Sequence, residues 1–288
     1  MKAFEWEQPR DWGEAISMLD PRDLTVRVMA GGTALMLMMK SGVFQPTRLI
    51  SLQGLGQEAG AIVQEAQGGI RIGALCSLTA LGQSSAVATT APVIIRTLKT
   101  LSNVRVRNVA TLGGHLAHAD PHMDLPPVMM ALGATVKTVG ARSSRTLTMS
   151  ELYRGYYETA LEPDELICEI VIPSQVGRSA VYLKCSTRAA DDWPTLGVAV
   201  NVKCDGDVIE KARIVVSAAT EKPIELVAAQ TLLEGHSISP SRLNDCAELA
   251  LAQAPLVSDA RGTASYKKEL LRVYLKRAIQ IALKGTIS

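Results

Sequence analysis

One stretch decides the fold of this 288-residue chain: Thr111-Leu112-Gly113-Gly114-His115-Leu116-Ala117-His118-Ala119-Asp120-Pro121-His122-Met123-Asp124-Leu125-Pro126-Pro127. It holds two adjacent glycines, three of the four histidines and two aspartates. Adjacent glycines allow positive φ angles and let a ligand approach the backbone closely, and the amides that such a turn leaves free form an anion cradle. Asp124 precedes an apolar run, where a short acidic side chain can cap a helix. The stretch therefore predicts a turn that holds a phosphate-bearing ligand, followed by a helix.

A second glycine pair lies upstream, in Val28-Met29-Ala30-Gly31-Gly32-Thr33-Ala34-Leu35. A strand-like run ends at Ala30, and a helix-like run continues from Thr33 to Lys40. A strand, a glycine turn and a helix N-terminus make a phosphate site, because free amides and the helix dipole both favour an anion there. Neither pair matches the G-x-G-x-x-G or G-x-x-x-x-G-K-[ST] pattern. Two such loops predict one long ligand whose diphosphate is held from both sides.

Composition argues against several other classes of protein. The formal net charge of +2 and the aromatic content of 4% do not favour a nucleic-acid-binding surface. No apolar run approaches the roughly 20 residues of a membrane span, and the N-terminus, with its acids and no apolar core, predicts no signal peptide. The five cysteines form no C-x-x-C pair, and their odd number fits buried thiols in a reducing cytoplasm. These cysteines are Cys76, Cys168, Cys185, Cys204 and Cys246.

Hydrophobic periodicity predicts an α+β chain. Helices are expected first, over residues 11–19, 33–40, 77–83 and 92–103, with residues 35–39 as a buried helix face and short strands at 48–51 and 70–73. Strands then predominate at 134–139, 145–149, 166–172, 181–186, 196–204 and 208–217, and helices follow at 224–233, 241–252 and 265–283. A glycine- and serine-containing patch after Pro173 marks the predicted domain boundary. We expect a first domain over 1–175, with subdomains of about 1–56 and 57–175, and a second over 176–288 with an antiparallel sheet and helices.

The motifs in this chain resemble those of the FAD-binding medium subunit of the molybdenum hydroxylases, the family of xanthine dehydrogenase and aerobic carbon monoxide dehydrogenase. The resemblance spans nearly the whole chain. It rests on Ala30-Gly31-Gly32-Thr33, Arg107-Asn108, Thr111-Leu112-Gly113-Gly114, Asp120-Pro121 with Asp124-Leu125-Pro126, Thr159-Ala160-Leu161-Glu162-Pro163-Asp164-Glu165-Leu166, and Ser258-Asp259-Ala260-Arg261-Gly262 with Tyr266.

The resemblance implies a two-subdomain FAD-binding fold of the vanillyl-alcohol-oxidase (PCMH) type, followed by an α+β C-terminal domain of the carbon monoxide dehydrogenase flavoprotein. It implies an electron-transfer subunit of a cytoplasmic heterotrimer, which pairs into a dimer of heterotrimers. The partners would be a large subunit with the molybdenum cofactor and a small subunit with two [2Fe–2S] clusters. FAD on this chain would pass electrons from those clusters to NAD, a quinone, oxygen or another acceptor. No catalytic residue is expected here, so the site residues are groups that position the cofactor.

The resemblance also implies which residues contact FAD. The diphosphate would lie on the amides of residues 30–34 and 111–115, with Asp124 as an acidic contact. Lys184 would lie near the isoalloxazine carbonyls, where a cation stabilises the reduced anionic flavin. The loop over the flavin face would carry Asp192 and Trp193. The complete implied set is Val28, Met29, Ala30, Gly31, Gly32, Thr33, Ala34, Leu35, Leu101, Thr111, Gly113, Gly114, His115, His118, Asp124, Ile167, Lys184, Asp192 and Trp193.

The sequence departs from the usual family pattern at two places. His115 stands where the family usually has Asn or Ser, and an imidazole beside a diphosphate can carry charge near neutral pH. The usual Pro-Gln before Asn108 is missing.

The clustered histidines and aspartates also allow a metal site, which Pro121 disfavours because it interrupts the helix that would align His118 with His122. A self-contained FAD oxidoreductase and a non-enzymatic nucleotide-binding scaffold are the remaining alternatives.

Overall fold

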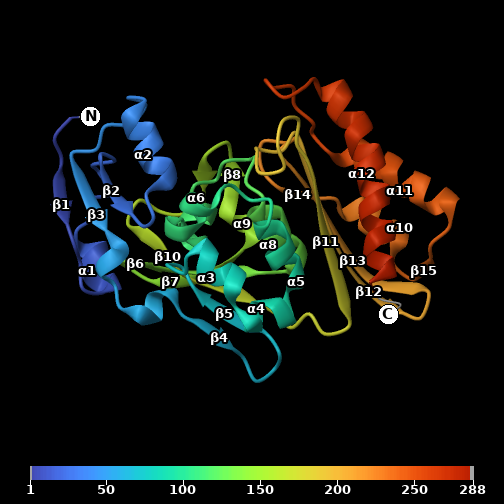
Figure 1. Cartoon of the computed structure of the whole chain (residues 1–288), viewed down its shortest axis with the longest axis horizontal. Coiled ribbons are helices and arrows are strands. Elements are labelled where there is room, and N and C mark those ends of the chain that lie inside the picture. The colour runs from blue at the N-terminus through green and yellow to red at the C-terminus, as the bar shows by residue number, and fades with distance from the viewer. Residues whose placement is uncertain (1, 286–288) are drawn as a thin grey trace.

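The chain forms three parts that follow one another along the longest axis of the molecule (Figure 1). The computed structural model describes residues 2–285. The first part, drawn in blue, is a small parallel sheet of order β1-β3-β2. Its elements are β1 (Glu5–Glu7), α1 (Trp12–Ser17), β2 (Val26–Met29), α2 (Thr33–Lys40), β3 (Arg48–Ser51) and two short 3-10 turns, Leu52–Gly54 and Gln57–Gly60.

The middle part is an antiparallel sheet of order β4-β5-β10-β6-β7 with short helices packed around it. Serine, threonine and asparagine side chains cap many of these helices, as Ser77 does by accepting the amide of Ala80. The elements are β4 (Ile62–Gln64), β5 (Ile70–Gly73), α3 (Leu78–Gln83), α4 (Ser85–Thr90), α5 (Pro92–Leu98), α6 (Val104–Val109), α7 (Leu112–Ala117), α8 (Leu125–Leu132), β6 (Thr135–Gly140), β7 (Ser144–Thr148), α9 (Met149–Leu152), β8 (Tyr153–Gly155), β9 (Glu158–Thr159) and β10 (Glu165–Ile172).

The third part is an antiparallel sheet of order β11-β12-β13-β14 beside three helices, drawn in orange and red (Figure 1). Alternate residues of the long strands face α10, α11 and α12 and form a separate apolar core. The elements are β11 (Arg178–Cys185), β12 (Leu196–Asp205), β13 (Val208–Ser217), β14 (Ile224–Glu225), α10 (Val227–Leu233), β15 (His236–Ser237), α11 (Pro240–Gln253) and α12 (Ala264–Lys284).

Helix α8 joins the middle part to the third part. Its eight residues are all buried, and it packs against both β12 and β13. The buried Asn201 of β12 donates hydrogen bonds to the Ala131 carbonyl and the Gln175 amide oxygen, at 3.0 and 2.9 Å. Because Ala199 and Val215 of the third part also belong to the middle core, the two parts share one continuous apolar contact.

The α+β class and the antiparallel C-terminal sheet with its helices agree with the prediction, and the strands at 48–51 and 70–73 have the predicted bounds. The predicted buried face over residues 35–39 is wrong: Met39 alone among them is buried, and Leu37 is 67% exposed. The domain bounds at 56 and 175 stay a prediction. No helix in the described part of the chain has both the length and the apolar character of a membrane span.

Candidate cofactor site

The main chain of the first glycine segment meets the residues that directly precede the second. A Cβ atom on Gly31 would overlap the carbonyl oxygen of Val109, so a residue with any side chain cannot take its place without a shift of the backbone. A Cβ atom on Gly114 would lie 3.7 Å from the Cβ of Ala30. Segments about 80 positions apart in sequence therefore lie together, close enough for one ligand to contact both.

The first glycine segment offers free amides at the start of α2. Gly32 has a φ of 69°, and its carbonyl accepts the first helical hydrogen bond from Met36 at 2.8 Å. The amides of residues 32–35 donate to no other atom within residues 2–285. An anion at this helix N-terminus would satisfy these donors and interact favourably with the helix dipole. The prediction of a glycine turn with positive φ is correct at Gly32.

The second glycine segment has a different structure from the one predicted. Gly113 and Gly114 lie in the first turn of α7, not in a turn with positive φ. The amides of residues 112–115 are already paired, with the carbonyls of Cys76, Ala74 and Thr111 and with the Thr111 hydroxyl, at 2.8 to 3.2 Å. The prediction that these amides are left free is therefore wrong. The glycines instead permit close packing, since a Cβ on Gly113 would lie 2.6 Å from that of Ala74.

His115 is buried in α7, and its Nε2 atom has no hydrogen-bond partner among the described residues. Burial, with a smaller contribution from His118, lowers the pKa of His115 to about 3. Burial therefore favours the neutral imidazole in the chain alone. The expectation that His115 carries charge beside a diphosphate stays a prediction. Burial also lowers the pKa of His118, whose ring makes an edge contact with Tyr157 at 5.3 Å between centroids.

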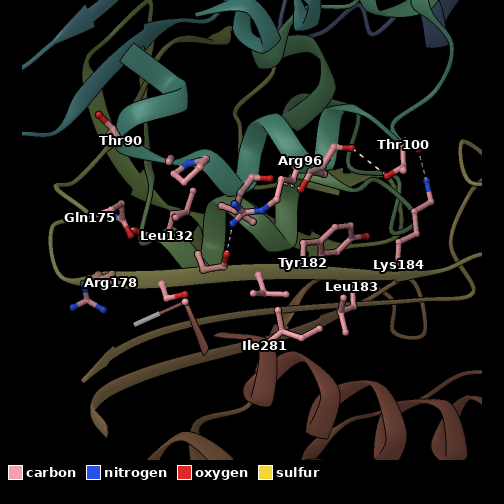
Figure 2. A pocket seen from close by; sticks show the side chains of 18 residues that line it. Thr90, Arg96, Thr100, Leu132, Gln175, Arg178, Tyr182, Leu183, Lys184 and Ile281 are labelled. Atoms are coloured by element: carbon pink, nitrogen blue, oxygen red, sulfur yellow. Dashed lines mark hydrogen bonds between the residues drawn. The ribbon is translucent and has the colours of Figure 1, made fainter. Parts of the chain in front are cut away.

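Asp124 and Lys184 form a buried ion pair. The Lys184 ammonium donates to Asp124 Oδ2 at 2.9 Å and to the Thr100 carbonyl at 3.0 Å, and the Tyr182 hydroxyl donates to Asp124 Oδ1 at 2.7 Å. Figure 2 shows Tyr182 and Lys184 on the same strand, with the ammonium directed at Thr100. Burial raises the pKa of Asp124, and the pair with Lys184 opposes this rise. The predicted helix cap is wrong: Asp124 precedes α8, but its side chain caps no amide.

The two apolar residues expected beside the cofactor lie in the core of the middle part. Leu101 and Ile167 are both buried and belong to the middle core. The guanidinium of Arg107 donates to the Leu101 carbonyl at 2.9 Å and also to that of Ser102, whose φ is 52°. Arg107 therefore fixes the loop before α6, which gives the Arg107-Asn108 motif a structural role.

Trp193 and Asp192 lie in the connection between β11 and β12. The Trp193 ring is stacked on His122, with centroids 5.9 Å apart and planes 11° apart. The Arg261 guanidinium lies 5.5 Å from the Trp193 ring centroid and donates to the Trp193 carbonyl at 3.0 Å. The sequence did not predict that His122 and Arg261 contact Trp193, because these residues lie 71 and 68 positions away and no local pattern marks the contact.

A cavity of about 670 Å³ lies away from the glycine segments, between α5, β11 and α12. Figure 2 shows Arg96 reaching across it toward β11, where its Nη2 atom donates to the Ala180 carbonyl at 2.8 Å. Lys184 and Thr100 lie at one end of this cavity, whereas the glycine segments contribute no residue to its lining. The size of this cavity therefore does not identify the cofactor site. The candidate site is identified by the backbone of the glycine segments instead.

The residues present fit FAD. Free amides at the start of α2 match a diphosphate. The buried Nε2 atom of His115, which has no hydrogen-bond partner among the described residues, is a further polar group that a ligand could satisfy. The three neighbouring histidines do not converge on one point: His115 is buried in α7, His118 contacts Tyr157, and His122 contacts Trp193. Within residues 2–285 no group of three His, Cys, Asp or Glu side chains is arranged to hold a metal ion.

Comparison with known proteins agrees with this geometry. Residues 2–175 match the family described as "FAD binding domain in molybdopterin dehydrogenase", and residues 181–282 match "CO dehydrogenase flavoprotein C-terminal domain". The carbon monoxide dehydrogenase medium chain of Afipia carboxidovorans is 30% identical over 97% of this chain and 96% of its own length.

Two solved structures have nearly the same fold. A carbon monoxide dehydrogenase from Hydrogenophaga pseudoflava, which lacks the Mo-pyranopterin moiety, superposes with a TM-score of 0.94 at 30% identity and covers 99% of this chain and 98% of that one. Quinoline 2-oxidoreductase from Pseudomonas putida 86 superposes with a TM-score of 0.92 at 28% identity and covers 100% of both.

The chain therefore belongs to the family of FAD-binding domains of molybdopterin dehydrogenases. It is an FAD-binding medium subunit of the molybdenum hydroxylase family, and thus a flavoprotein subunit of a molybdenum-containing oxidoreductase. The predicted family, the predicted fold and FAD as the cofactor of this chain are confirmed.

Proposed function

We propose that this chain is the electron-transfer subunit of a heterotrimeric molybdenum hydroxylase. A large subunit with the molybdenum cofactor would oxidise the substrate, and a small subunit with two [2Fe–2S] clusters would deliver the electrons. The name "medium chain" of the Afipia carboxidovorans relative, which is similar over almost the whole chain, supports such partners. We infer that two heterotrimers associate, and that the complex works in the cytoplasm, where the five free cysteines would stay reduced.

The observation that carries this proposal is the meeting of the two glycine segments beside four free amides. FAD supplies two-electron redox chemistry when it is bound. The amides of residues 32–35 would bind its diphosphate, and residues 28–31, Thr111, Gly113 and Gly114 would line it closely. His115 would present its neutral Nε2 atom to the cofactor, and His118 would lie in the same wall.

The remaining site residues would surround the flavin ring. Leu101 and Ile167 would contact it as apolar groups, and Asp192 with Trp193 would cover it. Lys184 would direct its third N–H donor toward the ring, because its other two are used by Asp124 and Thr100. This placement lets the ammonium raise the flavin potential while Asp124 and Tyr182 hold it still.

The function is tested by anaerobic addition of substrate to the complex purified from its native host. Carbon monoxide, an N-heterocycle, an aldehyde and a purine are the candidate substrates. We expect one of them to bleach the flavin absorbance only when the partner subunits are present, whereas dithionite bleaches it in the isolated chain as well. Bleaching of the isolated, FAD-loaded chain by substrate would instead show a self-contained oxidoreductase.

The placement of FAD is tested separately with Gly32→Val and Gly114→Val, which put side chains where the diphosphate would lie. Both variants should lose FAD, measured as the ratio of flavin to protein absorbance. Gly42→Val is the matched control for Gly32→Val, because Gly42 has a similar φ of 76° and a Cβ there meets no atom within 4 Å. Full flavin occupancy in either folded variant would contradict this placement.

A further inference from the structure

An ionic cluster beside Trp193 ties distant segments of the chain together. His122 precedes α8, and its Nδ1 atom lies 3.1 Å from Asp120 Oδ1. Its Nε2 atom lies 3.3 Å from Oδ2 of Asp259, in the connection between α11 and α12. The same Asp259 oxygen accepts a hydrogen bond from the Lys267 ammonium of α12 at 2.6 Å, and Lys267 is fully buried. We call these four residues the His122 cluster.

The geometry of the His122 cluster assigns a charge to the imidazole. A neutral imidazole donates from one nitrogen only, so its other nitrogen would turn a lone pair toward a carboxylate oxygen. Because both nitrogens of His122 face carboxylates, only the imidazolium can donate to Asp120 and Asp259 together. The imidazolium also balances the charges, since the cluster then holds two anions and two cations.

The surroundings of Asp120 favour the same charge. The carboxylate is buried, and its hydrogen bonds come from His122 and from the Tyr157 hydroxyl. Burial acts to raise the pKa of Asp120, but the hydrogen bonds from His122 and Tyr157 outweigh it and lower the pKa. No cation other than His122 contacts Asp120 among the described residues, so a neutral imidazole would leave a buried, ionised carboxylate without a counter-ion.

The imidazole also makes the main ring contact of Trp193. The two rings are stacked, and the Arg261 guanidinium approaches the same indole. Trp193 is 47% exposed, and most of the connection that carries it is exposed as well. Packing alone therefore leaves the ring little constrained, and attraction between cations and its π face is the remaining force that sets its position.

We propose that His122, in its imidazolium form, is a positioning residue that holds the Trp193 ring in one orientation. The cluster fixes the imidazole to the segment before α8 and to the start of α12. Because the Trp193 ring is stacked on this imidazole, the β11–β12 connection is held in place as well. The consequence for the flavin rests on the proposed function, in which Trp193 covers the ring. Loss of the His122 charge would then uncover the flavin without removing Trp193.

Protonation is tested on the unmodified protein, so that this test does not depend on a variant that folds. Nitrogen NMR of the imidazole rings distinguishes the imidazolium from the neutral tautomers for each of the four histidines. At neutral pH we expect His122 to carry protons on both ring nitrogens, while the buried His115 and the half-buried His118 are neutral. A single protonated nitrogen on His122 would overturn the proposal.

Positioning is tested by fluorine NMR of the fluorotryptophan-labelled chain, which has three tryptophans, with Trp193→Phe to assign the signal. His122→Gln removes the charge, and His122→Phe removes the charge but keeps an aromatic ring for stacking. We expect the Trp193 signal to move and broaden in both variants. His236→Gln is the control, because His236 is exposed in β15 and should leave the signal unchanged. An unchanged Trp193 signal in both folded His122 variants would overturn the proposal.

The FAD-loaded chain separates this proposal from the proposed function. We measure how fast small external reagents reach the flavin in His122→Gln and in Trp193→Phe. A several-fold increase in both variants supports the full proposal. A mobile Trp193 with unchanged flavin access in both variants supports the role of His122 but contradicts the placement of Trp193 over the flavin. Faster access in Trp193→Phe without any change in His122→Gln overturns the role of His122.

Discussion

Gly31 shows how a single absent side chain joins two parts of a binding site. Its backbone lies directly against the Val109 carbonyl, so the strand–helix unit of the first sheet touches the end of α6. Main-chain contact of this kind is sensitive to one methyl group, because neither backbone can rotate out of the way as a side chain can.

Gly31→Ala should therefore loosen this contact. We expect a loss of about 1–3 kcal/mol in the free energy of unfolding, as for other overpacked sites, together with a fall in FAD occupancy. Thermal unfolding and the flavin-to-protein absorbance ratio measure the two effects. Gly56→Ala is the matched control, since a Cβ there meets no atom within 4 Å. Wild-type occupancy in Gly31→Ala would show that the contact does not shape the site.

Lys184→Met should destabilise the protein in a pH-dependent way. The change leaves Asp124 buried without a cation, which costs about 3–5 kcal/mol when a buried pair is broken. Burial already raises the pKa of Asp124, and loss of Lys184 raises it further. A folded-state pKa above the unfolded one means that stability falls as pH rises, so the deficit against wild type should be larger near about pH 8 than near about pH 4.

Urea unfolding of both proteins across that pH range measures the deficit. Lys268→Met, at an exposed position of α12, should show no such deficit at any pH. A deficit in Lys184→Met that stays constant with pH would argue that Asp124 does not respond to the loss of its partner.

At the scale of elements, Glu165 at the start of β10 is held by two neighbouring strands. Its carboxylate accepts from Arg145 Nε and Nη2 of β7, at 2.7 and 2.6 Å, and from the Thr138 hydroxyl of β6. It also accepts the Glu162 amide at 2.9 Å, which folds the preceding turn. Burial acts to raise the pKa of Glu165, but these hydrogen bonds outweigh it and lower the pKa to about 2.

Glu165→Gln should lower stability by about 1–3 kcal/mol at neutral pH, because it removes hydrogen bonds between charged groups. A lowered folded-state pKa means that the stabilisation is complete above the ordinary carboxyl range and disappears as pH falls toward about 2. Denaturant midpoints of wild type and variant should therefore converge in acid. Glu58→Gln, at an exposed position, is the control. A gap that persists unchanged in acid would contradict the role of the ionised carboxylate.

Local sequence signals predicted elements well where capping and periodicity agree. Ser77 marks the start of α3 as predicted, because its hydroxyl caps the helix. The pair Gly113-Gly114 was predicted as a turn, but Thr111 caps α7, and the Ala74 and Cys76 carbonyls pair with amides that the turn would have left free. Helix α6 was also missed, since its three valines do not favour a helix.

Contacts between distant residues explain most of what the sequence did not predict. Tyr182 lies 58 positions from Asp124, and its hydroxyl holds the carboxylate that was expected to contact only the cofactor and the helix. Strand periodicity places Tyr182 on the same face as Lys184, so this residue could have been found from the spacing of two. No comparable pattern links Trp193 to His122, because both lie in irregular connections.

At the scale of the whole molecule, the third part is joined to the middle part by α8 and by the buried Asn201. Asn201→Ala removes the donor to the Ala131 carbonyl and leaves that acceptor unpaired. We expect a loss of about 1–3 kcal/mol in the free energy of unfolding, in line with other unsatisfied buried groups. Thermal unfolding measures it, and Asn244→Ala on the exposed side of α11 should cost far less. Equal stability of both variants would show that Asn201 contributes nothing to the junction.

The contact between Gly31 and Val109 also limits how relatives of this protein can diverge. A relative with a side chain at position 31 must shift the backbone at positions 109–110. An insertion near position 109 must likewise be matched by a change in the loop that carries Gly31. Relatives that keep the backbone path at positions 109–110 should therefore keep glycine at position 31, whatever side chain position 109 carries.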